Sequence, residues 1–130
     1  MSTKNEVIRL WKEKAEHDLG TAEIIFSHIP AYQDTIAFHC QQAAEKYLKA
    51  LLLFYDIPFK RQHSLNYLLG LLSAQIEISD ELYEKATVLE DFAVEIRYPD
   101  MVINLSEEEL INAIDIAKEI KVFVEDKLGL

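Results

Sequence analysis

Residues 37–54, AFHCQQAAEKYLKALLLF, decide the fold that the sequence predicts. Apolar side chains fall on most sides of a helix drawn through this stretch, and only a few polar residues interrupt them. A helix of this kind is buried centrally, or is buried on two sides by a core and a partner molecule. We therefore expect a buried helix over about residues 32–55. Asp56-Ile57-Pro58 ends it, because the residue before a proline avoids helical backbone angles.

The sequence on either side of this helix predicts four more helices from the signals at their ends. Two capping boxes, Thr3-x-x-Glu6 and Ser106-x-x-Glu109, place polar side chains where they can satisfy the free amides of a helix start. Because the connections are short, neighbouring helices should run roughly antiparallel. We therefore expect an all-α fold, an up-and-down antiparallel bundle of about five helices. The other end signals are Pro30 after the first helix, Ser64 before a short third helix, Ser79 or Asp80 before a fourth helix that ends ahead of Pro99, and Gly129 after the fifth.

The composition is typical of one globular domain over residues 1–130. Hydrophobic residues make up 50% and charged residues 28%, which excludes intrinsic disorder. Three glycines and three prolines are few for the turns of a β-sandwich or barrel. No apolar run approaches the length of about 18 residues that a membrane span needs, so no membrane association is expected. The single cysteine, Cys40, cannot form an internal disulfide, which favours a reducing, cytoplasmic compartment.

The net charge of −10 is unevenly distributed along the chain. Residues 1–76 carry eight acidic and eight basic side chains, whereas residues 77–130 carry fifteen acidic and five basic ones. An acidic chain is a poor nonspecific binder of nucleic acid, because phosphate contacts require cations. A local basic patch in the neutral half can still bind phosphate.

Few residues point to metal or nucleophilic chemistry. None of the four histidines has a glutamate three residues earlier, so the Glu-x-x-His pairs of di-iron bundles are absent. Cys40 falls within the apolar pattern and is best explained as a core residue. The three glycines are isolated, which excludes a glycine-rich phosphate loop. We therefore expect neither a metal nor a cofactor.

A polar stripe on the second helix is a candidate binding surface. His39, Gln42, Lys46 and Lys49 are spaced so that they share one helical face. With the basic loop that contains Lys60, Arg61 and His63, the two lysines could form a patch that attracts phosphate. The alternative is a solvated face on which Glu45 and Lys49 form an ordinary i,i+4 pair. The candidate binding residues of this region are Gln42, Lys46, Lys49, Arg61 and His63.

Arg97-Tyr98-Pro99-Asp100 forms a second candidate cluster. Arg97 could bind phosphate through its planar guanidinium group, and Tyr98 could add a stacking ring. In the simpler interpretation, Arg97 is a cation that stabilises the end of a helix. Arg97, Tyr98 and Asp100 are therefore candidates for binding a nucleotide or a partner.

The stretch over residues 37–51, followed by His63-Ser64-Leu65, resembles HEPN domains, small helical modules whose name stands for higher eukaryotes and prokaryotes nucleotide-binding. The first helix, with Trp11, Lys14, Ala15, Asp18, Leu19 and Ala22, resembles the opening pattern of the family. The stretch Arg97-Tyr98-Pro99-Asp100 resembles a prokaryotic branch of it. The resemblance implies a helical bundle that forms a homodimer. It also implies a partner, because many prokaryotic members are encoded beside a minimal nucleotidyltransferase and form toxin–antitoxin pairs with it.

Active HEPN members are metal-independent endoribonucleases that carry an arginine followed by four to six residues and a histidine. Arg97 matches the arginine, but no histidine follows it anywhere in this chain. We therefore expect a non-enzymatic, dimeric binding module for a nucleotidyltransferase, a nucleotide or RNA. One alternative is a divergent ribonuclease that combines Arg97 with His63 or His39, and another is a purely structural scaffold.

The apolar periodicity also predicts which side chains form the core. We expect six residues, spread over four of the five helices, to be largely buried: Trp11, Phe38, Leu48, Leu51, Leu89 and Ile114.

Overall fold

The computed structural model describes residues 3–95 and 105–129. This part of the chain forms five α-helices and no strand, which confirms the all-α prediction. In chain order the helices are α1 (Lys4–His28), α2 (Gln33–Phe54), α3 (Leu65–Leu72), α4 (Asp80–Glu95) and α5 (Glu107–Leu128).

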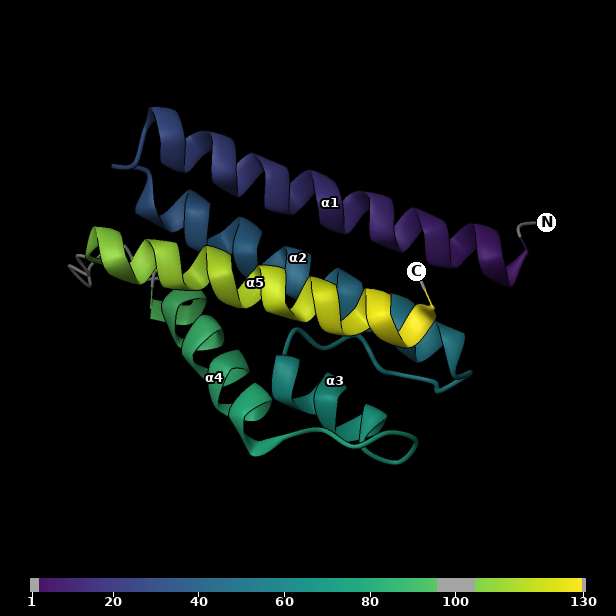
Figure 1. The fold of residues 1–130 in the computed structure, drawn as a ribbon. Coiled ribbons are helices and arrows are strands. Elements are labelled where there is room, and N and C mark those ends of the chain that lie inside the picture. Colours follow the sequence, from purple (N-terminus) through teal and green to yellow (C-terminus); the bar gives the residue numbers. More distant parts are fainter. Residues whose placement is uncertain (1–2, 96–104, 130) are drawn as a thin grey trace.

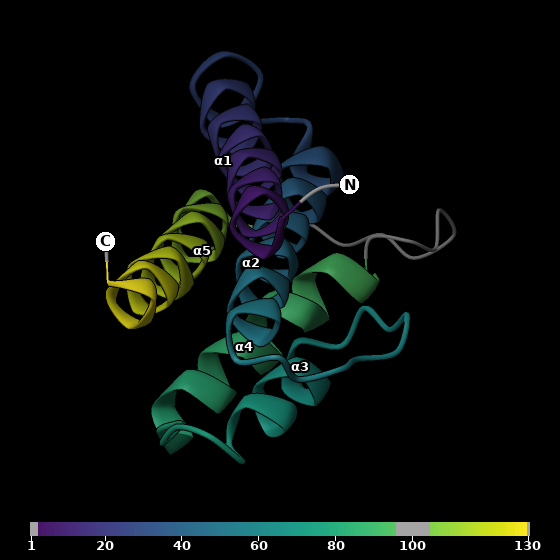
Figure 2. The ribbon, with the colours of Figure 1, turned by 90° about the vertical axis from the view of Figure 1, so that its right-hand side faces the viewer.

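Helix α2 is the central element of the bundle, and it contacts each of the other four helices. Figure 2 shows α1 above α2, α5 to the left of it, and α3 and α4 below it. Helix α1 runs antiparallel to α2, since Lys4 at its start pairs with Asp56 beyond the end of α2. Helices α2 and α5 run in the same direction because α3 and α4 return the chain between them (Figure 1). The apolar character of α2 is therefore explained by its central position in this chain.

The helix ends follow the local signals in the sequence. Both capping boxes form, with the Thr3 and Ser106 side chains accepting from the amides of Glu6 and Glu109. Gly129 ends α5 with a φ of 85°, a left-handed angle that glycine adopts without steric cost. After α2, Asp56 takes a φ of 57°, which aspartate tolerates better than most residues.

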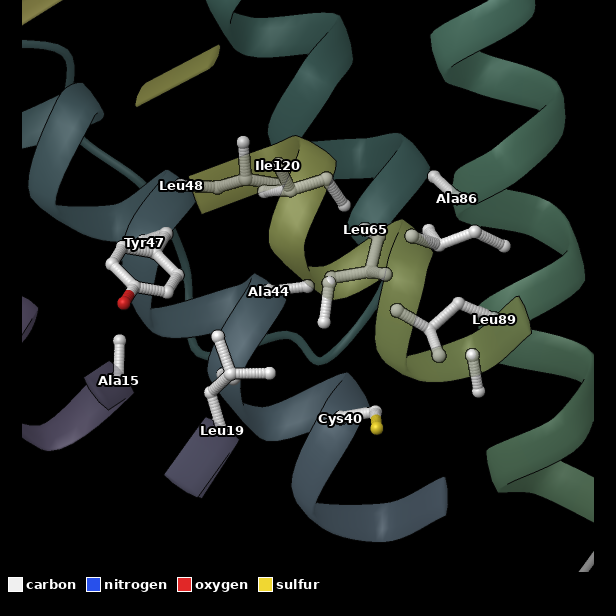
Figure 3. Packing of buried hydrophobic residues seen from close by; sticks show 14 of the residues in the cluster. Ala15, Leu19, Cys40, Ala44, Tyr47, Leu48, Leu65, Ala86, Leu89 and Ile120 are labelled. Carbon is white, nitrogen blue, oxygen red and sulfur yellow. The ribbon is translucent and has the colours of Figure 1, made fainter. Parts of the chain in front are cut away.

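The core fills the space between α2 and its four neighbours (Figure 3). Four of the six predicted core residues are buried, namely Leu48, Leu51, Leu89 and Ile114. The predictions for Trp11 and Phe38 are wrong, because Trp11 is only half-buried and Phe38 is 46% exposed. Ile36, which is fully buried, lies two residues or about 200° around the helix from Phe38, so Phe38 faces away from the core.

None of the helices in residues 3–95 and 105–129 combines the length and the apolar character that a membrane crossing requires.

Candidate functional site

Three polar side chains on α2 are buried although the helix is otherwise packed with apolar groups. Gln41, Glu45 and Lys49 recur every four residues and therefore lie on one face of the helix. Each is less than a tenth exposed. A buried charge is costly unless it is paired and hydrogen-bonded, so the partners of Glu45 and Lys49 define this region.

Glu45 uses both carboxylate oxygens. Its Oε1 lies 2.8 Å from His63 Nδ1, and its Oε2 lies 3.5 Å from Lys49 Nζ. The His63 side chain is 66% exposed, whereas that of Glu45 is 4% exposed. A buried carboxylate therefore holds an imidazole ring that faces solvent.

The backbone on both sides of this ring is also fixed. The Gln41 side-chain amide donates to the His63 carbonyl at 2.8 Å. Ser64 caps α3 by accepting from the Tyr67 amide, and Glu90 on α4 accepts from the Leu65 amide. The loop that carries His63 is thus held by α2 on one side and by α4 on the other.

Aromatic rings surround the Lys49 ammonium group. Its Nζ lies 5.6 Å from the centre of the Trp11 ring and 5.7 Å from that of Phe59. Both distances are within the range of cation–π attraction. The half-buried position of Trp11 follows from this contact, since its ring covers a charged side chain near the surface.

Asp18, Lys46 and His39 form a second cluster, which, like that of Glu45, Lys49 and His63, combines a carboxylate, a lysine and a histidine. Asp18 on α1 accepts from Lys46 Nζ at 2.5 Å through Oδ2, and its Oδ1 lies 2.8 Å from His39 Nδ1. The ring of His39 also meets the Phe38 ring edge-on, with 5.4 Å between the centres. The His39 side chain is 25% exposed, so this ring is much more covered than that of His63.

A hollow of about 460 Å³ lies between the start of α4 and the end of α5, away from both clusters. Lys85 lies across it, with Nζ 2.8 Å from Glu81 and 2.7 Å from Glu119. These hydrogen bonds raise the pKa of Lys85, and the bond to Lys85 lowers the pKa of Glu81. The charged side chains of Lys85, Glu81 and Glu119 in this hollow are therefore paired with one another.

The family model of the HEPN domain matches residues 8–127. The chain belongs to the HEPN family.

Its fold agrees with three solved structures. TT1696 from Thermus thermophilus is 32% identical with a TM-score of 0.81, over 92% of this chain and 97% of the other. ST0689, an archaeal HEPN homologue, is 28% identical with a TM-score of 0.73, over 92% and 96%. A HEPN domain protein of Thermotoga maritima, TM0613, is 25% identical with a TM-score of 0.74, over 92% and 97%. No protein of curated function matches this HEPN chain.

The HEPN fold divides the predicted basic patch between the two clusters, because Lys49 and His63 share the Glu45 carboxylate whereas Lys46 pairs with Asp18. Lys46 and Lys49 each lie within 4 Å of a carboxylate, that of Asp18 or Glu45. Gln42 donates to the neighbouring Gln41 side chain at 3.1 Å, which places it beside the His63 loop. In that loop Lys60 and Arg61 are exposed. The positive charge most open to a ligand is therefore on the loop and not on α2.

The second predicted cluster, Arg97, Tyr98 and Asp100, lies outside the residues that the structure describes. Sequence reasoning missed Glu45 as the partner of His63, and it missed Asp18 as the partner of Lys46 and His39. A signal for Glu45 was present, since it is an acidic residue within an apolar helix. Among the described residues, no group of three or more histidine, cysteine, aspartate or glutamate side chains could hold a metal ion.

Proposed function

We propose that this HEPN protein is a single-domain binding module that acts as a homodimer. Its partner is a minimal nucleotidyltransferase, in a toxin–antitoxin-like pair, and its ligand is a nucleotide or RNA. Family membership supports this proposal. The observation that carries it is the cationic loop, in which exposed Lys60 and Arg61 lie beside an imidazole ring that faces solvent.

The binding residues in this proposal are those of the loop and of residues 97–100. Arg61 and His63 contact the phosphate, and Gln42, Lys46 and Lys49 shape the adjoining face of α2. A guanidinium group can bind a phosphate through two parallel hydrogen bonds, which gives Arg97 a role that a lysine cannot fill. Tyr98 and Asp100 complete the second half of this site.

Binding of a labelled RNA or of ATP, followed by fluorescence anisotropy or calorimetry, tests the proposal. Arg61→Ala and Arg97→Ala should each weaken binding while the helical content is unchanged, and Arg97→Lys should also weaken it. Arg9→Ala is the matched control, because Arg9 is an exposed arginine on α1. Loss of about 0.3–1 kcal/mol of stability without any change in binding would mean that Arg97 only stabilises a helix end.

The Glu45–His63 pair favours a second function, a divergent metal-independent ribonuclease. In this reaction His63 Nε2 accepts the proton of a ribose 2′-hydroxyl, whose oxygen forms a bond to phosphorus. The bond from phosphorus to the 5′-oxygen breaks, and the proton passes from His63 to that oxygen, leaving a cyclic phosphate and a 5′-hydroxyl. Arg97 stabilises the negative charge of the transition state.

RNA incubated with the purified protein and a chelator separates the two functions. A binding module should cleave no faster than buffer. A ribonuclease should cleave without metal, and His63→Ala and Arg97→Ala should each abolish the cleavage.

A further inference from the structure

We propose that Glu45 is a positioning residue that fixes which nitrogen of His63 carries the proton, so that Nε2 faces solvent as a proton acceptor. The catalytic use of this arrangement rests on the second proposed function, the ribonuclease. The arrangement itself consists only of described residues and can be tested without a substrate.

The hydrogen bond between the two side chains determines the tautomer. A carboxylate has only acceptor oxygens, so the bond of 2.8 Å to Glu45 Oε1 requires the proton on Nδ1 of His63. In a neutral ring the lone pair is then on Nε2. Since the His63 side chain is 66% exposed, this nitrogen is accessible to a ligand.

Glu45 is held firmly enough to impose this orientation. Its side chain is 4% exposed, and its second oxygen lies 3.5 Å from Lys49 Nζ. Lys49 is itself held between the rings of Trp11 and Phe59. The carboxylate cannot turn away from His63 without leaving the buried ammonium group unpaired, which is costly.

The position of the ring is fixed from the backbone as well. The Gln41 amide holds the His63 carbonyl, and Glu90 holds the amide of Leu65 two residues later. A group that is held in place before the ligand arrives needs no reorganisation when a proton is transferred. The neighbouring cations, Lys60 and Arg61, suit a substrate in which the reacting hydroxyl is close to a phosphate.

The Asp18–His39 pair provides a matched comparison within the same molecule. The distance to Nδ1 is the same, 2.8 Å, but His39 is 25% exposed and packs against Phe38. Asp18→Asn should therefore change the tautomer of His39 and leave that of His63 unchanged.

Nuclear magnetic resonance of protein labelled with ¹⁵N-histidine tests the proposal, because long-range couplings identify the protonated ring nitrogen. At about pH 8.5, where ordinary histidines are neutral, wild-type His63 should carry its proton on Nδ1. Glu45→Gln should shift His63 towards the Nε2-protonated form, whereas Asp18→Asn should not. An Nε2-protonated ring in the wild-type protein would overturn the proposal, and this spectrum requires no variant to fold. A His63 tautomer that is unchanged in a folded Glu45→Gln protein would overturn it too.

An activity measurement separates this proposal from the ribonuclease function. If the protein cleaves RNA, Glu45→Gln should lower kcat by about 10²–10⁴-fold and leave KM unchanged, because His63 would no longer present an unprotonated Nε2 as the general base while binding is retained. Asp18→Asn should leave kcat unchanged. An unchanged kcat in Glu45→Gln would overturn the catalytic use of the pair. A wild-type protein with the expected tautomer but no cleavage would contradict the ribonuclease function and uphold the positioning role of Glu45.

Discussion

At the scale of single residues, Lys49 shows how a charged side chain is accommodated inside a helical bundle. It is 8% exposed, its ammonium group faces the Glu45 carboxylate, and two aromatic rings cover it. Such a pair contributes little compared with apolar residues of the same size, but removing one partner leaves the other buried without compensation. The pair is therefore sensitive to single substitutions and tolerant of a matched double substitution.

Lys49→Met should destabilise the protein by roughly 3–5 kcal/mol, because Glu45 then keeps only His63 as a partner. The double variant Lys49→Met, Glu45→Gln should recover part of this loss, as urea unfolding would measure. Lys46→Met is the control, and its effect should be smaller because Lys46 and Asp18 are both more exposed. Equal losses in the two single variants would contradict this account of Lys49.

Because Cys40 is buried, the free energy of unfolding should depend on pH in the alkaline range. Burial, with a contribution from the Glu23 carboxylate, raises the pKa of the thiol from 9.0 to about 12. The neutral thiol is favoured in the folded state, so its contribution is fully present below about pH 9 and is lost as the pH rises towards 12.

Replacing Cys40 by alanine should therefore make the free energy of unfolding fall less steeply above pH 9. Urea unfolding of both proteins at neutral and at alkaline pH measures the difference. Comparing the two proteins cancels the titration of Tyr47, whose pKa burial also raises, and of the lysines. Parallel pH profiles would show that the thiol ionises normally in the folded state.

At the scale of elements, α2 holds more buried residues than any other described helix. Leu48 and Leu51 are fully buried, and replacing either by alanine should cost roughly 2–5 kcal/mol through lost transfer energy and the cavity left behind. Phe38→Ala should cost much less, since Phe38 is 46% exposed. Denaturant midpoints measure all three variants. A loss below about 0.5 kcal/mol for both leucines would contradict the central position of α2.

The helices could be predicted because their signals are local. Thr3 with Glu6, Pro30, Ser64 and Gly129 each act within a few residues of a helix end, and the described helix ends agree with them. The apolar periodicity predicted the buried positions of α2 less completely. Because apolar residues occur on most of its sides, the pattern alone did not exclude Phe38 from the buried set.

The candidate site could be predicted only in part, because its bonds join residues that are far apart in the chain. His63 was selected for its chemistry, but its bond to Glu45 spans 18 positions and depends on the path of the loop. The bonds of Asp18 depend on how α1 lies against α2. Spacing within one helix placed Lys46 and Lys49 on a common face, yet it could not indicate the carboxylates that pair with them.

At the scale of the whole molecule, we expect a homodimer. The described helices of one chain already cover most of α2, so the expectation now depends on family membership and on Phe38, which remains exposed. Light scattering at micromolar concentration should give twice the mass of the 15.0 kDa chain. Phe38→Ser should lower this mass if Phe38 lies in the interface. Val122→Ser is the control, because Val122 on α5 is an apolar side chain that is 64% exposed. A 15.0 kDa species for the wild-type protein would contradict the dimer.

The central position of α2 also determines how the native protein opens. Every other helix of the described chain contacts α2, so its middle turns stay covered while these helices remain packed on it. Backbone amides near Ala43 and Tyr47 should therefore exchange with deuterium only through complete unfolding, at a rate that reports the full stability of the protein. Amides at the start of α1 should exchange through local fraying, and the difference between these two rates measures how cooperative the bundle is.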